Sequence, residues 1–256
     1  AFTMYSSKNP YNNIFNLNIT YNHGTIDNPE LSRASELWSL LGTESRTFEE
    51  IELELQKIGA EMYLNVNNGS STLTISGFDE NLDEILAICE DKIYNAKYDA
   101  SKLAIMIDGE KMNKKTDKDS PDTWNSALYS YVLYGDKSAY LNKMDIKKWA
   151  KRDGDVILNE FKEIFNYGGD ISFNGNVDTK DVIAMLNSHN IIKNDAVKAE
   201  RKVNIPQEQN ENIVYFAHNK KFRQSNISIY VQGEKLNKDE KALSSVFNKY
   251  FGTDMY

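Results

Sequence analysis

Cysteine is nearly absent from this sequence, with Cys89 the single example among 256 residues. One cysteine cannot form a disulfide within the chain, and it cannot build a cysteine-based zinc site. Cys89 lies in the apolar run 85–89, so we expect a buried and unreactive thiol. The cysteine content therefore gives no indication of the redox compartment.

Long apolar runs are also missing. No stretch approaches the ~18 consecutive apolar residues that a membrane helix needs, so we expect no insertion into a membrane. No signal peptide opens the sequence, and we expect either a mature form or an excised segment. The abundance of Asn, Lys and Tyr favours an AT-rich bacterial genome. The compartment stays open, with a periplasmic or envelope location compatible with the sequence.

Histidine is scarce, and the three residues His23, His189 and His218 are scattered over separate predicted elements. No pair has the spacing of zinc ligands, so we interpret them as structural or surface side chains. The sequence has neither a Gly-x-Gly-x-x-Gly pattern nor a P-loop. It also lacks a nucleophile elbow that would indicate serine catalysis.

Acidic residues outnumber basic ones, giving a net charge of -8 and a pI of about 5.1. The basic residues are mostly interleaved with acidic ones, as in residues 111–118. A nucleic acid would be repelled by this field, so we expect no nucleic-acid partner. The 40% of hydrophobic residues is enough to form a sizeable core.

Two hydrophobic periods divide the chain into predicted elements. Alternation of apolar and polar residues predicts strands at 15–21, 61–66, 71–76, 170–175, 213–217 and 224–232. Helical spacing predicts helices at 31–41, 47–58, 81–95, 101–114, 121–131, 145–151, 155–165, 179–186 and 240–251. This order favours an α+β fold.

The composition changes near Lys193, where the sequence becomes polar and shows little hydrophobic periodicity. This stretch, which contains Pro206, predicts a linker over 193–211. Residues 1–192 then form one α+β domain. Residues 212–256 hold two predicted strands and one helix, which are too few to enclose a core. We therefore expect residues 212–256 to be the partial start of a second α+β domain.

Several ordered landmarks run through almost the whole chain. A strand leads into residues 21–25, the next helix closes at Gly42-Thr43, and a strand pair ends at 72–77. Later landmarks lie at 134–140 and 172–178. In order and spacing this chain resembles the insulinase/pitrilysin (M16, inverzincin) zinc metallopeptidase family. The resemblance implies a helix-backed, largely antiparallel sheet of about six strands, plus the start of a second such domain.

Catalytic members of that family carry His-x-x-Glu-His on the first helix, where two histidines bind zinc and the glutamate acts on the attacking water. Aligned on Gly42-Thr43, Arg33 and Leu37 stand in place of the histidines and Glu36 in place of the base. Glu110 falls loosely near the place of the distal glutamate ligand. Neither Arg33 nor Leu37 can ligate zinc, so the resemblance implies no catalytic residue, no metal site and no cofactor in this chain.

These positions have plainer interpretations as well. Glu36 could be a solvated helix residue, or paired with Arg33 or Arg46, and Glu110 could be a similar surface residue. Arg33 could instead contact a substrate.

The resemblance implies a function as the non-catalytic half of a zinc metalloendopeptidase. In this interpretation the chain forms chamber wall and substrate contacts, while a partner half, covalent or separate, carries the zinc and an extended peptide is the substrate. The segment itself would be inactive. One alternative is a structural or binding subunit of the same fold without a proteolytic role. Another is an unrelated α+β binding protein.

Overall fold

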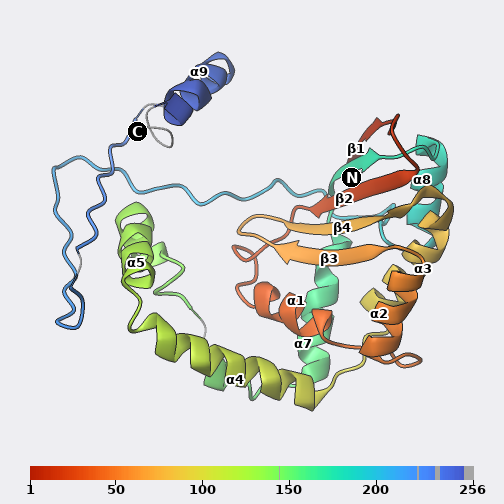
Figure 1. Cartoon of the computed structure of the whole chain (residues 1–256), viewed down its shortest axis with the longest axis horizontal. Helices are drawn as coiled ribbons and strands as arrows, with labels where there is room; N and C mark the ends of the chain where they lie inside the picture. The colour runs from red at the N-terminus through yellow and green to blue at the C-terminus, as the bar shows by residue number, and fades with distance from the viewer. Residues whose placement is uncertain (144, 224, 234–236, 251–256) are drawn as a thin grey trace.

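A computed structural model of the chain describes all residues except 144, 224, 234–236 and 251–256. Its centre is a sheet of five strands, backed by helices, from which a helical arm extends (Figure 1). The strands are β1 (Phe2–Ser7), β2 (Ile14–Tyr21), β3 (Glu61–Val66), β4 (Ser71–Phe78) and β5 (Gly169–Asn174). Their spatial order is β1-β5-β2-β4-β3. Every pairing is antiparallel except that of β1 with β5, so the largely antiparallel α+β sheet is confirmed.

The sheet has one apolar and one polar face because side chains alternate along each strand. In β2, Phe15, Leu17 and Ile19 are fully buried, whereas Asn16 and Asn18 point to the other side. The buried side faces the helices, and the polar side is left open. This alternation is the sequence pattern that predicted the strand.

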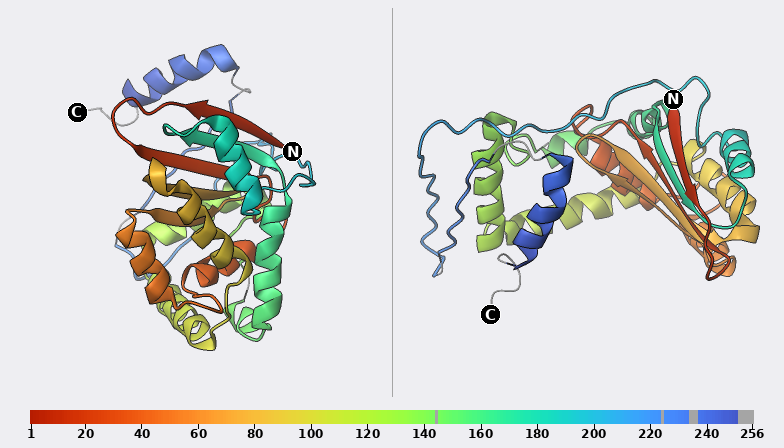
Figure 2. Two further views of the ribbon diagram at one scale, coloured as in Figure 1. Left: turned by 90° about the vertical axis from the view of Figure 1, so that its right-hand side faces the viewer. Right: turned by 90° about the horizontal axis from the view of Figure 1, so that it is seen from above.

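Helices pack on the apolar face of the sheet, as the two turned views show (Figure 2). They are α1 (Leu31–Ser39), α2 (Phe48–Lys57), α3 (Leu82–Tyr94), α7 (Gly154–Lys162) and α8 (Thr179–Ser188). Three short 3-10 turns lie at η1 (Asp79–Asn81), η2 (Gly135–Lys137) and η3 (Glu163–Asn166).

The centre of the core is aromatic. Trp38 of α1 stacks on Phe161 of α7 with ring centroids 5.0 Å apart, and Phe161 contacts Phe165 edge-on at 5.6 Å. The hydroxyl of buried Tyr21 donates to the carbonyl of Ile191 at 2.7 Å, which satisfies its polar end inside the core. The first helix is therefore held tightly against both the sheet and α7.

Helix α2 is defined by its two ends. The Thr47 hydroxyl accepts from the Glu50 N–H, while the Glu50 carboxylate accepts from the Thr47 N–H, forming a capping box. After the helix, Gly59 adopts a φ of 64°, which favours glycine and turns the chain into β3. The helix predicted at 47–58 is confirmed, and it contains α2.

The remaining described helices lie away from the sheet. Helices α4 (Ala100–Asp117) and α5 (Pro121–Tyr134) form the arm, α6 (Ile146–Trp149) leads back towards α7, and α9 (Lys238–Asn248) follows the C-terminal extended segment (Figure 1). In the described part of the chain, no helix combines the length and apolarity that crossing a bilayer requires.

Residues 207–223 and 225–230 run along the arm. The Gln207 side chain donates to the carbonyl of Val132 at 2.8 Å, and Tyr215 contacts Tyr131 edge-on at 6.0 Å. Farther along, Phe222 meets Trp124 and Tyr230 meets Tyr129. Helix α5 therefore packs against the C-terminal segment and not against the sheet.

Several details differ from the sequence prediction. Strand β1 was not predicted, and it pairs with β5 across most of the chain length. The strands predicted at 213–217 and 225–232 are wrong, because these residues pair with no other strand in the described structure; residue 224 lies outside it. The sheet accordingly has five strands where about six were expected. Helix α9 covers 238–248, and residue 251 of the predicted helix is not described.

Candidate functional site

Helix α1 presents two different faces. Leu31, Ala34, Leu37 and Trp38 are buried against the core, while Glu36 is exposed. The start of the helix is fixed by Arg152, whose guanidinium pairs with Glu30 just before α1.

The same Arg152 guanidinium binds Glu160 of α7 at 2.5 Å. This hydrogen bond holds the pKa of Glu160 below its usual value. Arg152 therefore anchors the first turn of α1 to α7.

The Arg33 guanidinium meets a carboxylate from the arm. Arg33 Nη2 lies 2.5 Å from Glu110 Oε1, with side-chain exposures of 14% and 31%. Helix α4 brings Glu110 to this place, and its start is capped by the Asp99 carboxylate, which accepts from the Ser101 N–H. Two residues 77 positions apart thus form a partly buried ion pair between α1 and α4.

The four motif positions predicted from sequence separate into two environments. Arg33, Glu36 and Glu110 line one groove of about 990 Å³. Leu37 is fully buried and lies in the core. The structure therefore brings three of the four positions together.

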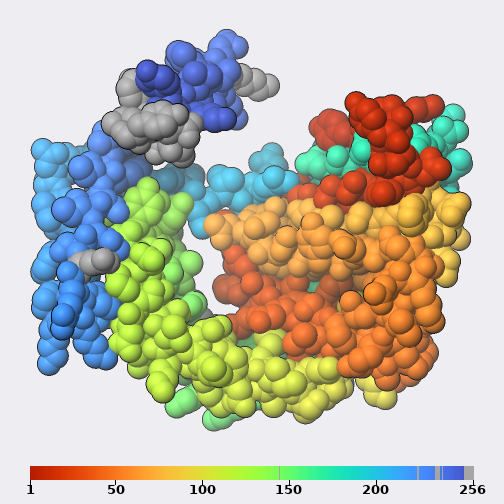
Figure 3. All heavy atoms as spheres, in the orientation of Figure 1, coloured from red at the N-terminus to blue at the C-terminus, as the bar shows by residue number. Residues whose placement is uncertain are grey.

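This groove belongs to a larger hollow. Figure 3 shows the surface hollowed between the arm, drawn in yellow-green, and the α1 and β3 region, drawn in orange and red. Lys114, Lys143 and Lys147 contribute positive charge to the groove, and Asp117 and Asp145 contribute negative charge. A groove lined by side chains of both charges is better suited to a polar extended peptide than to a small apolar ligand.

The residues at the motif positions do not fit zinc. Zinc sites use about three strong donors, such as imidazole, thiolate or carboxylate. Here Arg33, at the first histidine position, is a cation, and Leu37, at the second, is a buried alkyl group. The Glu110 carboxylate accepts a hydrogen bond from Arg33. No group of three or more His, Cys, Asp or Glu side chains suited to a metal ion occurs among the described residues.

The histidines occupy three unrelated environments. His23 is buried and stacks on Tyr167 with ring centroids 4.1 Å apart. His189 lies between the carboxylates of Asp83 and Glu90, at 2.9 and 3.2 Å. His218 stacks on Phe216 in the C-terminal segment. This distribution agrees with the structural roles predicted from the sequence.

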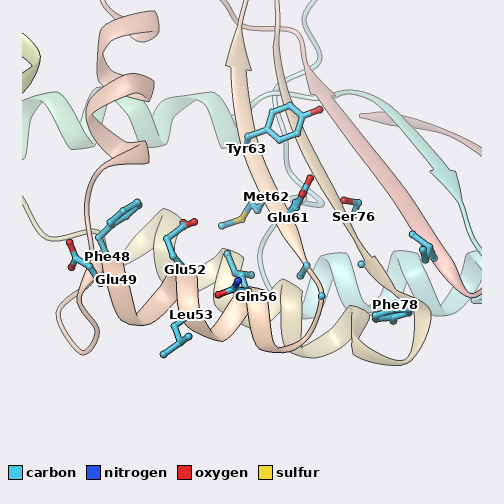
Figure 4. Close-up of a pocket in the computed structure, with 15 residues that line it drawn as sticks. Phe48, Glu49, Glu52, Leu53, Gln56, Glu61, Met62, Tyr63, Ser76 and Phe78 are labelled. Atoms are coloured by element: carbon cyan, nitrogen blue, oxygen red, sulfur yellow. The ribbon is translucent and has the colours of Figure 1, made fainter. Parts of the chain in front are cut away.

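A second groove was not anticipated from the sequence. It measures about 1150 Å³ and lies between α2 and the outer strand β3, as Figure 4 shows. Exposed Leu53, Tyr63 and Phe78 line it together with glutamates. The signal available in the sequence was weak, because an apolar residue on the polar side of a helix or strand does not by itself indicate a groove.

Solved structures provide the comparisons. The inactive domain of a peptidase M16 from Pseudomonas fluorescens matches with a TM-score of 0.64 and 13% identity, covering 80% of this chain and 51% of that one. The ferredoxin protease FusC, solved as a mutant in complex with Arabidopsis ferredoxin, also gives 0.64, at 12% identity over 76% of this chain and 22% of that one. The first half of the periplasmic protease PqqL from Escherichia coli matches with a TM-score of 0.60 and 14% identity, covering 82% of this chain and 47% of that one.

These likenesses define the fold of the chain as that of an M16 peptidase domain, including one inactive domain. The chain spans between about a fifth and a half of the length of these proteins. No protein-family model and no curated protein matches the sequence.

Proposed function

We propose that the chain is the non-catalytic half, or part of that half, of a zinc metalloendopeptidase of the M16 type. The observation that carries the proposal is the Arg33–Glu110 ion pair. By the family resemblance, Arg33 aligns with the first zinc histidine of catalytic members, and Glu110 falls loosely near the place of the distal zinc glutamate. The Arg33 guanidinium supplies a positive charge at this place, but unlike a zinc ion it cannot bind a water molecule as a ligand. It therefore joins α1 to α4 without activating water.

In this proposal the hollow between the arm and the sheet forms one wall of a chamber for an extended peptide. The zinc and the reacting groups belong to a partner half, in the same polypeptide or in a separate subunit. The chain then contributes shape, charge and substrate contacts. Its own motif position Glu36 has no zinc-bound water to act upon.

The domain division is part of the same proposal. Residues 1–192 would be the degenerate peptidase-type domain, 193–211 the linker and 212–256 the start of a second domain. Support comes from the apolar side chains of the last segment, since Val214 is 91% exposed and Ile229 is 86% exposed. Such exposure is expected where the covering part of a core is supplied by further residues.

The test is a cleavage assay with and without a zinc-bearing half. The purified chain, supplied with zinc and an unstructured peptide, should show no turnover. Addition of an M16 half with an intact His-x-x-Glu-His helix from the same organism should produce turnover that a chelator abolishes. Chelator-sensitive turnover by the chain alone would contradict the proposal. Stable association without any gain in turnover would favour a purely structural or binding subunit.

A further inference from the structure

A third groove lies where the β3–β4 hairpin meets the segment that leaves the sheet domain, and it measures about 630 Å³. Residues 66–70 of the hairpin line one side, and residues 201–204 line the other. Thr25, Ser32 and Tyr134 complete the lining. We call this the hairpin groove; in Figure 1 the outgoing segment passes beside the hairpin before it reaches the arm. Parts of the chain that are far apart in sequence therefore build one concave site.

The two sides of the hairpin groove are held together through the backbone. The N–H groups of residues 25–26 donate to the carbonyls of residues 67–68, at 2.9 and 2.8 Å. On the other side, a Cβ atom at position 69 would collide with the Lys202 carbonyl, so only Gly69 allows the outgoing segment to approach the hairpin this closely. The shape of the groove is therefore set by backbone contacts between the hairpin and its neighbours.

The charge of the hairpin groove is positive. Arg201 and Lys202 line it, and there is no Asp or Glu among the described residues that do so. Lys202 pairs with Asp27, which neutralises its charge. Arg201 Nη2 lies 3.9 Å from Asp170 Oδ2, which is too far for a hydrogen bond, and 48% of the Arg201 side chain is exposed. The planar donors of Arg201 are therefore available to an anion, and a carboxylate matches their geometry.

Neutral side chains add further hydrogen-bonding groups to the hairpin groove. Hydroxyls come from Ser32, Ser70 and Tyr134, and an amide comes from Asn204. A hydroxyl rotates to donate to an oxyanion, and an amide donates through its NH2 group. Donors grouped around one guanidinium form a site that suits a carboxylate and does not suit a cation or an apolar group.

The position of the hairpin groove indicates which carboxylate it holds. Ser32 lines both this groove and the groove formed by Arg33, Glu36 and Glu110, so the two grooves meet at the start of α1. An extended peptide that lies in the groove of Arg33 can therefore reach the hairpin groove with one end. Of the two ends of a peptide, the carboxyl end is the one that carries negative charge at neutral pH.

We propose that the hairpin groove binds the C-terminal carboxylate of a peptide. Arg201 pairs with the carboxylate, and the hydroxyls of Ser32 and Tyr134 donate to it, while the preceding residues of the peptide run past α1 towards Glu110. This inference rests on the proposed function and deepens it, because it names peptides with a free carboxyl end as the substrate class that the non-catalytic half holds.

The experiment uses the full chain and an eight-residue peptide of Ser, Asn and Ala, labelled at its amino end with an uncharged fluorophore. Fluorescence anisotropy should report saturable binding of the free acid, and salt should weaken it. The same peptide with a C-terminal amide should bind about tenfold more weakly, because the charge-assisted hydrogen bonds to Arg201 are lost. Equal affinity for the acid and the amide, or no saturable binding of the acid, would overturn the proposal.

A third peptide separates the two sources of a peptide carboxylate. It ends in an amide but has Asp as its last residue, so its negative charge lies on a side chain. It should bind like the uncharged amide, because the added amide group blocks the position of the terminal carboxylate. Binding as tight as that of the free acid would show that the groove holds acidic side chains, and would overturn the assignment to the carboxyl end.

Variants locate the binding. Arg201→Gln should lower the affinity for the free acid about tenfold and leave the affinity for the amide unchanged, at unchanged circular dichroism. Arg223→Gln, at another exposed arginine outside the groove, is the matched control and should change neither affinity. The same change for acid and amide in Arg201→Gln, or no change in either, would show that Arg201 does not bind the carboxylate and would overturn the proposal.

Failure of this inference can be distinguished from failure of the proposed function. Activation of a zinc-bearing half does not depend on Arg201, so the cleavage assay with a partner half tests the proposed function separately. A chain that supports turnover equally well on free-acid and amidated peptides would overturn only the carboxylate site.

Discussion

In the proposed function, the ion pair between Arg33 and Glu110 takes the place of a metal crosslink. A zinc ion joins the first helix to a later helix through side-chain donors from both. In this chain α1 and α4 are joined by a guanidinium and a carboxylate 2.5 Å apart. The charge-assisted hydrogen bond needs no cofactor, and it occupies the Glu110 carboxylate.

The first prediction concerns the energy of that pair. We expect Arg33→Leu and Glu110→Leu each to destabilise the fold. The double variant should lose less than the sum, because each single change leaves a partly desolvated charge without its partner. A coupling energy of about 1 kcal/mol is expected from a double-mutant cycle in urea unfolding. Strict additivity would mean that the two side chains do not stabilise each other.

A second prediction concerns His23 and acid. Burial lowers the pKa of His23 from its ordinary 6.5, although the negative charge of nearby Asp27 acts in the opposite direction. The folded state therefore favours the neutral ring, while the unfolded chain takes up the proton below about pH 6.5. Stability should be constant above this pH with respect to His23 and should fall as the pH decreases below it.

The measurement is thermal unfolding between pH 5 and pH 8 for three proteins. His23→Phe, which keeps an aromatic ring against Tyr167, should lose part of the acid-dependent decrease in Tm. His218→Gln, at an exposed position, should retain the full decrease. An identical pH profile for wild type and His23→Phe would rule out a contribution from this histidine.

At the scale of elements, the capped helix α2 determines where the edge strand β3 begins. The Thr47–Glu50 capping box fixes the start of α2, and Gly59 directs the chain into β3. Thr47→Ala should destabilise the protein by about 1 kcal/mol, because it leaves an N-terminal N–H of the helix without its acceptor. Chemical unfolding measures this change, with Thr116→Ala near the C-terminal end of α4 as a control that removes no N-cap. A Thr47→Ala protein as stable as wild type would contradict this role of the cap.

Elements with strong local signals were predictable from the sequence. The strand predicted at 61–66 coincides with β3, and the helix predicted at 81–95 contains α3. Apolar periodicity and end signals are local, so each element carries its own evidence. Strand β1 was missed because its pairing with β5 joins Phe2 to Gly169, and nothing local to residues 2–7 indicates that partner.

The candidate site was only partly predictable. Alignment on Gly42-Thr43 identified Arg33 and Glu36, but sequence spacing could not show that Glu110 reaches Arg33 across 77 positions. The groove beside β3 depends on which strand is outermost, and strand order is set by tertiary packing. Conversely, 213–217 and 225–232 have a strand pattern without a partner strand in the described residues. A pattern of alternation predicts a strand only where another strand is available to pair with it.

At the scale of the whole molecule, the chain has a well-packed sheet domain and a C-terminal segment whose apolar residues are largely exposed. Phe216 is 82% exposed and Ile229 is 86% exposed. These side chains contribute little to the stability of the sheet domain, but they favour association through exposed apolar surface. We therefore predict that Phe216→Ser/Ile229→Ser reduces binding of a hydrophobic dye and self-association, with the Tm of the sheet domain unchanged.

Light scattering and calorimetry on the same samples check both parts of that prediction. The matched control is Phe161→Ser, at a fully buried core position, which should lower the Tm strongly. A large decrease in Tm for the double surface variant would show that the C-terminal segment is part of the same core. It would also contradict the proposed division at 193–211.

The central claim is that the zinc positions of the fold are replaced in this chain. The most direct measurement is the zinc content of the purified chain after dialysis against a trace of free zinc. The account predicts less than about a tenth of an equivalent, because the aligned positions do not supply the three donors that a zinc site needs. Stoichiometric, tightly held zinc in the wild type would contradict the alignment of Arg33–Leu37 with the zinc motif and the proposed function with it.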